Sequence, residues 1–277
     1  MIRAILTASI LLGLGAGTAM AQNVTWKSGV GSGDANGFAA WRGRPLGLAT
    51  GWAPWDNWTN MLNYMKGGNP GNLKSRSTNV SIGLGLFPQS GGSLAECAAG
   101  AYAGNHRAIG QALAAKIADA EVRLGWEANN SSYPWTAVGK PADQWKACFV
   151  NAATAIKAGG PSLRIAWHVA KKGKINVYTI YPDQDDALIT NIGVSHFDDA
   201  EARFGFETAD GSPNGSPVGL KAWADLACAK KHKQLEMAEW GNGRRGDNPA
   251  YIERMYRFFS EAGSCLAHEG YLNGREH

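Results

Sequence analysis

Apolar and polar residues alternate in two regular ways along this chain. Short apolar runs predict buried β-strands, and they occupy Pro45–Gly51, Val80–Phe87, Val122–Glu127, Leu163–Val169, Leu188–Phe197, Gln234–Glu239 and Cys265–Leu272. Between these runs, apolar residues recur three and four positions apart, as on one face of a helix. The helices predicted in this way are Trp55–Met65, Asn105–Ala118, Ala142–Ala158, Leu220–His232 and Pro249–Ala262.

This alternation of strands and helices is typical of a parallel sheet built from β/α units. The chain length suits a single (β/α)8 TIM-type barrel of the α/β class. Seven strands are apparent, one fewer than a closed barrel needs. We expect the missing strand either between Met65 and Val80 or before Pro45, and we interpret the glycine-rich segment Val30–Asn36 as a flexible lead-in.

The first residues have the composition of a secretory signal peptide. One arginine precedes an apolar run, which ends at the small-residue site Ala19-Met20-Ala21. We therefore predict a signal peptide at 1–21 and a catalytic barrel at 22–277, in a secreted protein that is either extracellular or periplasmic. The alternative is an uncleaved N-terminal anchor. No later segment approaches the roughly 20 apolar residues of a membrane-spanning helix.

The four cysteines Cys97, Cys148, Cys228 and Cys265 are even in number and contain no C-x-x-C pair. In an exported chain this pattern predicts two disulfides rather than a zinc or redox site. The sequence leaves three pairings open. We favour Cys97 with Cys148 and Cys228 with Cys265, because each pair joins nearby elements.

Composition narrows the class of partner. The 27 basic residues exceed the 23 acidic ones only slightly and are dispersed, whereas a nucleic-acid-binding protein concentrates them. The 11 tryptophans favour a sugar ligand, since aromatic faces offer contact area at little entropic cost. We expect a polysaccharide or oligosaccharide substrate, no nucleic acid, no membrane association after signal cleavage, and a monomer.

Carboxylates follow two of the predicted strands, each beside a tryptophan. Glu127 ends one strand and Glu239 ends another, and the C-terminal strand ends of a β/α barrel meet at one mouth. Two carboxylates flanking a glycosidic bond are what glycoside hydrolysis requires; a separation of about 5 to 5.5 Å gives retention, and about 6.5 to 9.5 Å gives inversion. The alternative is that each is a structural ion-pair partner, for instance Glu127 with Arg123.

These segments also carry a family resemblance. The segment 123–130 (RLGWEANN), followed by YPW at 133–135, resembles the R-x-x-H-E-x-N-G…W-x-W segment of glycoside hydrolase family 26, a clan A family that includes β-mannanases. MAEWG at 237–241 resembles its nucleophile segment, and weaker similarity extends from Pro45 to Leu272. The resemblance implies a retaining enzyme with Glu127 as acid/base on the fourth strand and Glu239 as nucleophile on the seventh.

Two positions depart from the family pattern. Trp126 stands where the family has histidine, and Phe197 where it has a tyrosine that donates to the nucleophile. The adjacent His196 is a substitute only if it faces the barrel interior, since neighbours on a strand point to opposite sides. His168, at the end of another strand, is a further candidate. For either histidine a structural role is the alternative.

The remaining candidates would bind substrate around the two carboxylates. Trp52, Trp135 and Trp240 are the predicted sugar-stacking residues, joined by Trp126, Arg123 and a hydroxyl-binding amide at Asn129 or Asn130. Trp41 and Trp223 are expected in the core or in helix packing, and Glu236, deep in its strand, is expected to be structural.

The leading hypothesis is thus a secreted retaining endo-glycosidase acting on β-mannan-like polysaccharide, or on β-glucan, β-1,3-xylan or an exopolysaccharide. The alternative is a sugar-binding barrel with little or no turnover. A secreted enzyme of other chemistry lacks support, because the chain contains no G-x-S-x-G or H-E-x-x-H motif. We expect no cofactor and no metal ligands.

Overall fold

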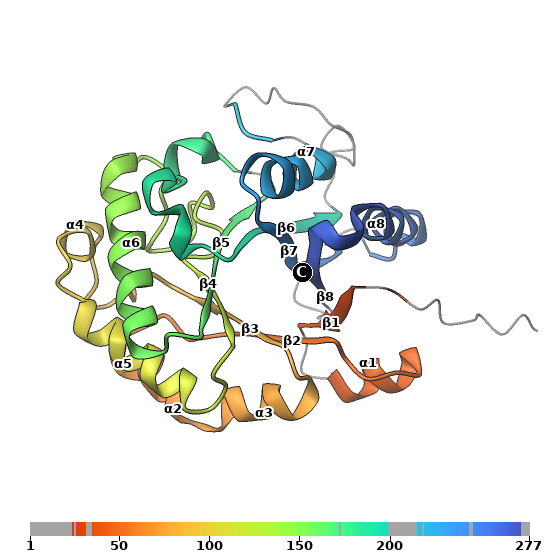
Figure 1. Ribbon diagram of the computed structural model, residues 1–277, viewed down its shortest axis with the longest axis horizontal. Coiled ribbons are helices and arrows are strands. Elements are labelled where there is room, and N and C mark those ends of the chain that lie inside the picture. The colour runs from red at the N-terminus through yellow and green to blue at the C-terminus, as the bar shows by residue number, and fades with distance from the viewer. Residues whose placement is uncertain are drawn as a thin grey trace, which may run out of the picture.

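Eight parallel strands close into a barrel, confirming the predicted fold class. The computed structural model describes residues 24, 26–31, 35–171, 173–198, 215–217, 219–243 and 246–272, so the predicted signal segment lies outside the described residues. Figure 1 shows the strands as an inner ring with the helices around it. The strands are β1 (Lys27–Val30), β2 (Leu48–Trp52), β3 (Val80–Leu84), β4 (Glu121–Leu124), β5 (Arg164–Ala170), β6 (Asn191–Asp198), β7 (Gln234–Asn242) and β8 (Leu266–Tyr271).

The strand missing from the sequence pattern is β1, before Pro45. It is short, and Gly29 interrupts its apolar character. A side chain on Gly29 would collide with the backbone of Leu48, so close pairing of β1 with β2 requires glycine here. β1 pairs with β2 on one side and β8 on the other, and thereby closes the barrel.

The predicted helices are present with shifted ends, and Pro249–Ala262 is confirmed with its bounds. Three helices escaped prediction: Ala35–Arg42, the polar Gly68–Arg76, and Leu94–Ala98, which has only five residues. The predicted helix at 220–232 divides into an α-helical and a π-helical turn. The helices are α1 (Ala35–Arg42), α2 (Trp58–Lys66), α3 (Gly68–Arg76), α4 (Leu94–Ala98), α5 (Ala103–Ala114), α6 (Ala142–Gly159), η1 (Val177–Ile180), η2 (Asp183–Leu188), α7 (Leu220–Ala224), η4 (Asp225–Lys230), α8 (Pro249–Ala262) and η5 (Gly263–Cys265).

The apolar core lies between the strands and the surrounding helices, while polar side chains occupy the barrel interior. In β4, Val122 and Leu124 belong to the main hydrophobic cluster. Their neighbours Glu121 and Arg123 instead reach side chains of β8 and β7, across the barrel. The period-two alternation of a strand therefore separates an apolar outer layer from a charged inner one.

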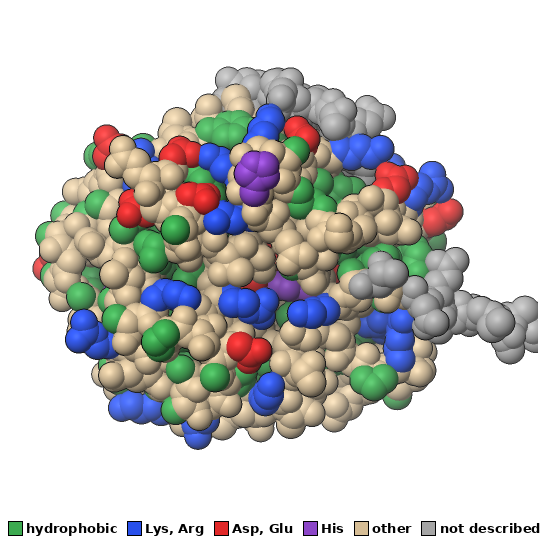
Figure 2. All heavy atoms as spheres, in the orientation of Figure 1, with side chains coloured by type: hydrophobic (Ala, Val, Ile, Leu, Met, Phe, Trp, Pro, Cys, Tyr) green, Lys and Arg blue, Asp and Glu red, His purple; other side chains and the backbone are tan. Residues whose placement is uncertain are grey.

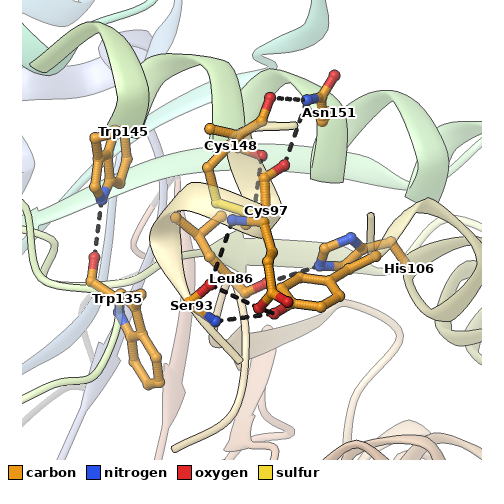
Figure 3. Close-up of a disulfide and its surroundings, with 11 residues drawn as sticks. Leu86, Ser93, Cys97, His106, Trp135, Trp145, Cys148 and Asn151 are labelled. Carbon is orange, nitrogen blue, oxygen red and sulfur yellow. Dashed lines mark hydrogen bonds between the residues drawn. A yellow bond between two sulfur atoms is a disulfide. The ribbon is translucent and has the colours of Figure 1, made fainter. Parts of the chain in front are cut away.

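Two disulfides tie helices at the periphery, in the pairing that the sequence favoured. Cys97 bonds to Cys148 and joins α4 to α6, and Cys228 bonds to Cys265 near the start of β8. In Figure 3 the first disulfide lies beside Asn151, whose amide donates to the carbonyl of Ala98 at 2.8 Å. Disulfides of this kind are typical of proteins in oxidising compartments.

Charges of both signs are interspersed with uncharged groups on the face shown in Figure 2. Within the described part of the chain, no helix has the length and apolar character needed to span a bilayer.

Candidate active site

The turn after β4 holds Glu127 in an unusual backbone conformation. Gly125 and Glu127 have φ angles of 60° and 52°, in the left-handed region that non-glycine residues seldom adopt. The turn is closed by two backbone hydrogen bonds. The N–H of Asn130 donates to the carbonyl of Glu127 at 2.8 Å, and the N–H of Ala137 donates to the carbonyl of Ala128 at 2.7 Å. Strained residues of this kind persist only where their surroundings fix them, and they cluster at functional sites.

Three buried tryptophans anchor this turn to the body of the protein. Trp145 on α6 donates its indole N–H to the carbonyl of Trp135 at 2.8 Å, and Trp135 donates in turn to the carbonyl of Trp126 at 3.0 Å. Figure 3 shows the indole of Trp145 directed toward Trp135. Because Trp126 immediately precedes Glu127, this relay of hydrogen bonds fixes the backbone that carries the carboxylate.

The surroundings of Glu127 favour its protonated form. The residue is 9% exposed, and burial, followed by the charge of Glu239, raises the pKa of its carboxyl group. Hydrogen bonds from the side chains of Asn130 and Ser195 offset part of this rise in pKa. The side-chain amide of Asn130 donates to Oε2 of Glu127 at 3.0 Å. The second carboxylate is therefore close enough to influence the first.

Glu239, on β7, is surrounded by groups that donate to its carboxylate. Arg123, which is fully buried, forms an ion pair with its Oε1. The indole N–H of Trp52 donates to the same oxygen at 2.7 Å. Arg123 is itself held by the carbonyl of Gly51 at 3.1 Å and lies 5.3 Å from the ring centroid of Trp52. The ends of β2, β4 and β7 thus meet around one carboxylate oxygen.

An irregularity in β7 lets two of its glutamates face the barrel interior. Glu236 and Glu239 are three residues apart, which in a regular strand would place them on opposite faces. The register between β7 and β8 shifts between Met237 and Trp240. As a result Glu236 lies within 3.6 Å of His168 and His268 inside the barrel, while Glu239 still pairs with Arg123.

Several predicted substrate-binding residues are instead part of the scaffold. Trp135 has no exposed surface and Trp126 only 2%, so neither offers a face for a sugar ring. Asn129 makes two hydrogen bonds with the backbone of Ala170, at 2.7 and 2.8 Å, and so joins the turn to β5. Of the two asparagines considered for hydroxyl binding, Asn130 is the one beside Glu127.

The predictions for His168, His196 and Trp240 also need correction. His168 lies inside the barrel, buried beneath the mouth. His196 faces outward, where its Nδ1 lies 2.9 Å from the hydroxyl of Tyr251 on α8. Trp240 faces outward as well and donates to Glu269 at 2.6 Å. Both follow from strand alternation, because each immediately adjoins a residue that faces inward.

Two further tryptophans complete the comparison with prediction. Trp223 is fully buried, as expected for helix packing, whereas Trp41 is 80% exposed and the packing prediction for it is wrong. Trp41 lies on α1, whose buried contact with the barrel is made by Ala35.

Tyr133 is a site residue that the sequence analysis quoted only as part of a motif. Its ring stacks on Trp135 with centroids 4.8 Å apart. Burial first, and then the charges of Glu127 and Glu239, raise the pKa of its hydroxyl. It therefore lies near both carboxylates, and its partial exposure makes it an aromatic surface available to a ligand. Its place two residues before Trp135 was the available signal.

Comparison with known structures supports the fold. No protein-family model matches the chain, and a search of curated proteins finds no match. Among solved structures, GH26C from Muricauda sp. MAR_2010_75 is similar with a TM-score of 0.64 at 12% identity, over 91% of this chain and 79% of that one. The YdhT protein from Bacillus subtilis has a TM-score of 0.55 at 12% identity, over 90% and 80% of the two chains.

The GH26 β-mannanase BoMan26A from Bacteroides ovatus has a TM-score of 0.53 at 15% identity, over 90% of this chain and 79% of that one. The resemblance to glycoside hydrolase family 26 that the motifs suggested is thus confirmed at the level of the fold.

Proposed function

We propose that this protein is a secreted retaining endo-glycosidase that hydrolyses β-linked polysaccharide by double displacement. The observation that carries the proposal is the pair of carboxylates at the ends of β4 and β7 in opposite surroundings. Burial and a neighbouring negative charge raise the pKa of Glu127, whereas Glu239 is paired with Arg123. One protonated and one ionised carboxyl group are what this reaction requires.

In the first step, Glu239 attacks the anomeric carbon while Glu127 protonates the departing oxygen. Trp52 and Arg123 both donate to Oε1 of Glu239, and Oε2 accepts no hydrogen bond from the described residues. Oε2 is therefore the oxygen we assign to the attack. In the second step, Glu127 as carboxylate takes a proton from water, which hydrolyses the glycosyl-enzyme.

The indole of Trp52 takes over a task that the family resemblance gives to tyrosine. Phe197 stands at the position of the family tyrosine and has no hydroxyl to donate. Trp52 donates to the same carboxylate from β2 instead. This contact supports turnover over the alternative of a sugar-binding barrel with no activity.

We propose β-mannan-like polysaccharide as substrate class, with β-glucan, β-1,3-xylan and exopolysaccharide as the other members of the test panel. The support is the shared fold with a GH26 β-mannanase and the aromatic ring of Tyr133 beside the carboxylates. Secretion is supported by the two disulfides.

A reducing-sugar assay over this panel tests the proposal with wild type, Glu127→Ala and Glu239→Ala, each checked for folding by its thermal midpoint. We expect activity on at least one polysaccharide and its loss in both variants. Activity that neither substitution affects would refute the site. Binding without turnover, seen by calorimetry in the wild type, would favour the sugar-binding barrel.

A further inference from the structure

A second polar cluster lies deeper in the barrel, below the two carboxylates at the mouth. Glu121 from β4, Glu236 from β7 and His268 from β8 each offer one ligand atom, and these three atoms all lie within 4.8 Å of one another. All three residues are at most 1% exposed. His168 from β5, equally buried, approaches the same Glu236. The proposed glycosidase mechanism uses none of the four.

Several atoms of this cluster lack hydrogen bonds. Nε2 of His268, Oε1 of Glu236 and both ring nitrogens of His168 are buried without a hydrogen-bond partner in the structure. His268 Nε2 lies only 3.0 Å from Glu121 Oε1, yet not in hydrogen-bonding geometry. Buried polar atoms are nearly always satisfied, so several orphaned ones that converge indicate a missing partner.

The separations suit a metal ion at the centre. Bonds of 2.0–2.2 Å from zinc to nitrogen or oxygen place tetrahedral ligands about 3.3 Å apart. The distances from His268 Nε2 to the two carboxylates are 3.0 and 3.6 Å, and His168 Nε2 lies 3.6 Å from Glu236 Oε1. Histidine and carboxylate donors together favour zinc over calcium or magnesium, which prefer oxygen alone.

The surrounding residues orient the carboxylates as second-sphere partners do in metal sites. The hydroxyl of Ser81 donates to Glu121 Oε1 at 2.9 Å, and the amide of Asn191 donates to the other oxygen. The backbone N–H of Ala238 donates to Glu236 Oε2 at 2.8 Å. Gly193 makes room for the cluster, because a side chain there would collide with Glu236 and His168.

A divalent cation would also balance the charge of the barrel interior. The barrel interior contains the carboxylates Glu121, Glu236 and Glu239, and Arg123 supplies one positive charge. A divalent cation bound by a neutral His268 would neutralise the other two carboxylates.

We propose that Glu121, Glu236 and His268 bind one Zn²⁺ ion inside the barrel, with His168 beside Glu236. All three ligands are buried, so the site is closed to bulk solvent, as structural zinc sites are. The ion would join β4, β7 and β8, two of which carry Arg123 and Glu239, and so stabilise the frame beneath the carboxylates at the mouth. Ligand burial implies that the ion enters during folding and leaves only when the barrel opens.

The test begins with wild-type protein carrying a tag without histidine. After loading by refolding from urea in the presence of Zn²⁺, followed by gel filtration, mass spectrometry of the metal content should find about one zinc ion per chain. Removal of zinc by unfolding in urea with EDTA, then refolding with and without Zn²⁺, should give thermal midpoints that differ by about 5 to 10 °C. Replacement by Co²⁺ should produce the visible absorption of a tetrahedral site.

Substitution of the proposed ligands tests where the zinc ion binds. Glu236→Gln and His268→Gln should each lower the affinity for Zn²⁺ by about tenfold or more. The matched control His232→Gln changes an exposed histidine and should retain one ion per chain. If a ligand variant does not fold, the metal content and Co²⁺ spectrum of the wild type decide.

Zinc below about 0.1 ion per chain after loading, with an unchanged midpoint, would overturn the proposal and identify a proton-sharing network instead. Full zinc content in both ligand variants would overturn the assignment of the ligands. None of these measurements depends on glycosidase activity, so the zinc site and the proposed function fail separately.

Discussion

Different interactions hold Glu127, after β4, and Glu239, on β7, in place. The turn after β4 is held by its backbone, through left-handed dihedral angles and the indole relay from Trp145 to Trp126. The end of β7 is held by charge, through Arg123 and the indole of Trp52. The first arrangement positions a carboxyl group without neutralising it, whereas the second stabilises an anion. Two carboxyl groups at one barrel mouth thereby have different surroundings, as the roles of acid and nucleophile require.

The largest effect is expected from replacing Glu127, the proposed general acid. Glu127→Gln should lower kcat on polysaccharide by about 10²- to 10⁴-fold, the range for loss of a general acid. The loss should be much smaller on aryl glycosides, whose leaving groups need no proton for the first step. Equal losses on both substrates would contradict the acid role. Glu253→Gln, an exposed change on α8, is the control.

The surroundings of Glu239 are tested by replacing Arg123, which forms the ion pair with it. Arg123→Met should lower the free energy of unfolding by about 3 to 5 kcal/mol, because it leaves a buried carboxylate uncompensated. Adding Glu239→Gln should recover much of the loss. Urea unfolding of the two single variants and the double variant measures this coupling, and additive losses would show that the ion pair is unimportant to the fold.

A smaller effect is expected from breaking the hydrogen bonds that join Trp145, Trp135 and Trp126. It shows whether Trp135 supports the turn or contacts the substrate. Trp135→Phe keeps an aromatic ring but leaves the Trp126 carbonyl without its donor, at a cost of about 1 to 3 kcal/mol in stability. We expect kcat to fall more than KM rises. A rise in KM alone would restore the sugar-stacking role first assigned to Trp135. Trp223→Phe is the control, since the buried indole nitrogen of Trp223 has no hydrogen-bond partner in the structure.

The smallest effect concerns the pKa of Glu127. The amide of Asn130 lowers that pKa, so Asn130→Ala should raise it further. A general acid is lost as the pH rises through its pKa, so the alkaline limb of kcat/KM should move to higher pH. Asn151→Ala, on α6, should leave the profile unchanged. A shift to lower pH would contradict the assignment.

The apolar pattern predicted most of the fold because barrel strands and helices have strong periodic signals. It missed β1 and α3, where glycine and polar residues dilute the signal, and the short helices α1 and α4. For the candidate site, Glu239 lies on the seventh strand as predicted, whereas Glu127 lies in the turn after the fourth strand, which ends at Leu124. The direction of the neighbouring tryptophans was not predictable, since a local register shift in β7 and the turn after β4 decide which side chains face the mouth.

The inner cluster of Glu121, Glu236 and His268 was invisible in the sequence for a different reason. Its residues come from three separate strands and form no motif along the chain. Only closure of the barrel brings them together. The expectation that the chain has no metal ligands came from local spacing, which does not detect a cluster assembled in this way, and metal analysis of the protein tests it.

The measurement that tests the central claim most directly is rescue by azide, with the anomeric configuration of the product read by NMR. With an activated β-glycoside, Glu239→Ala should regain activity in azide and release the α-glycosyl azide, because azide replaces the nucleophile. Glu127→Ala should instead give the β-glycosyl azide, formed from the glycosyl-enzyme. The reverse pattern would exchange the two roles, and a wild type that releases product with inverted configuration would contradict the double-displacement mechanism.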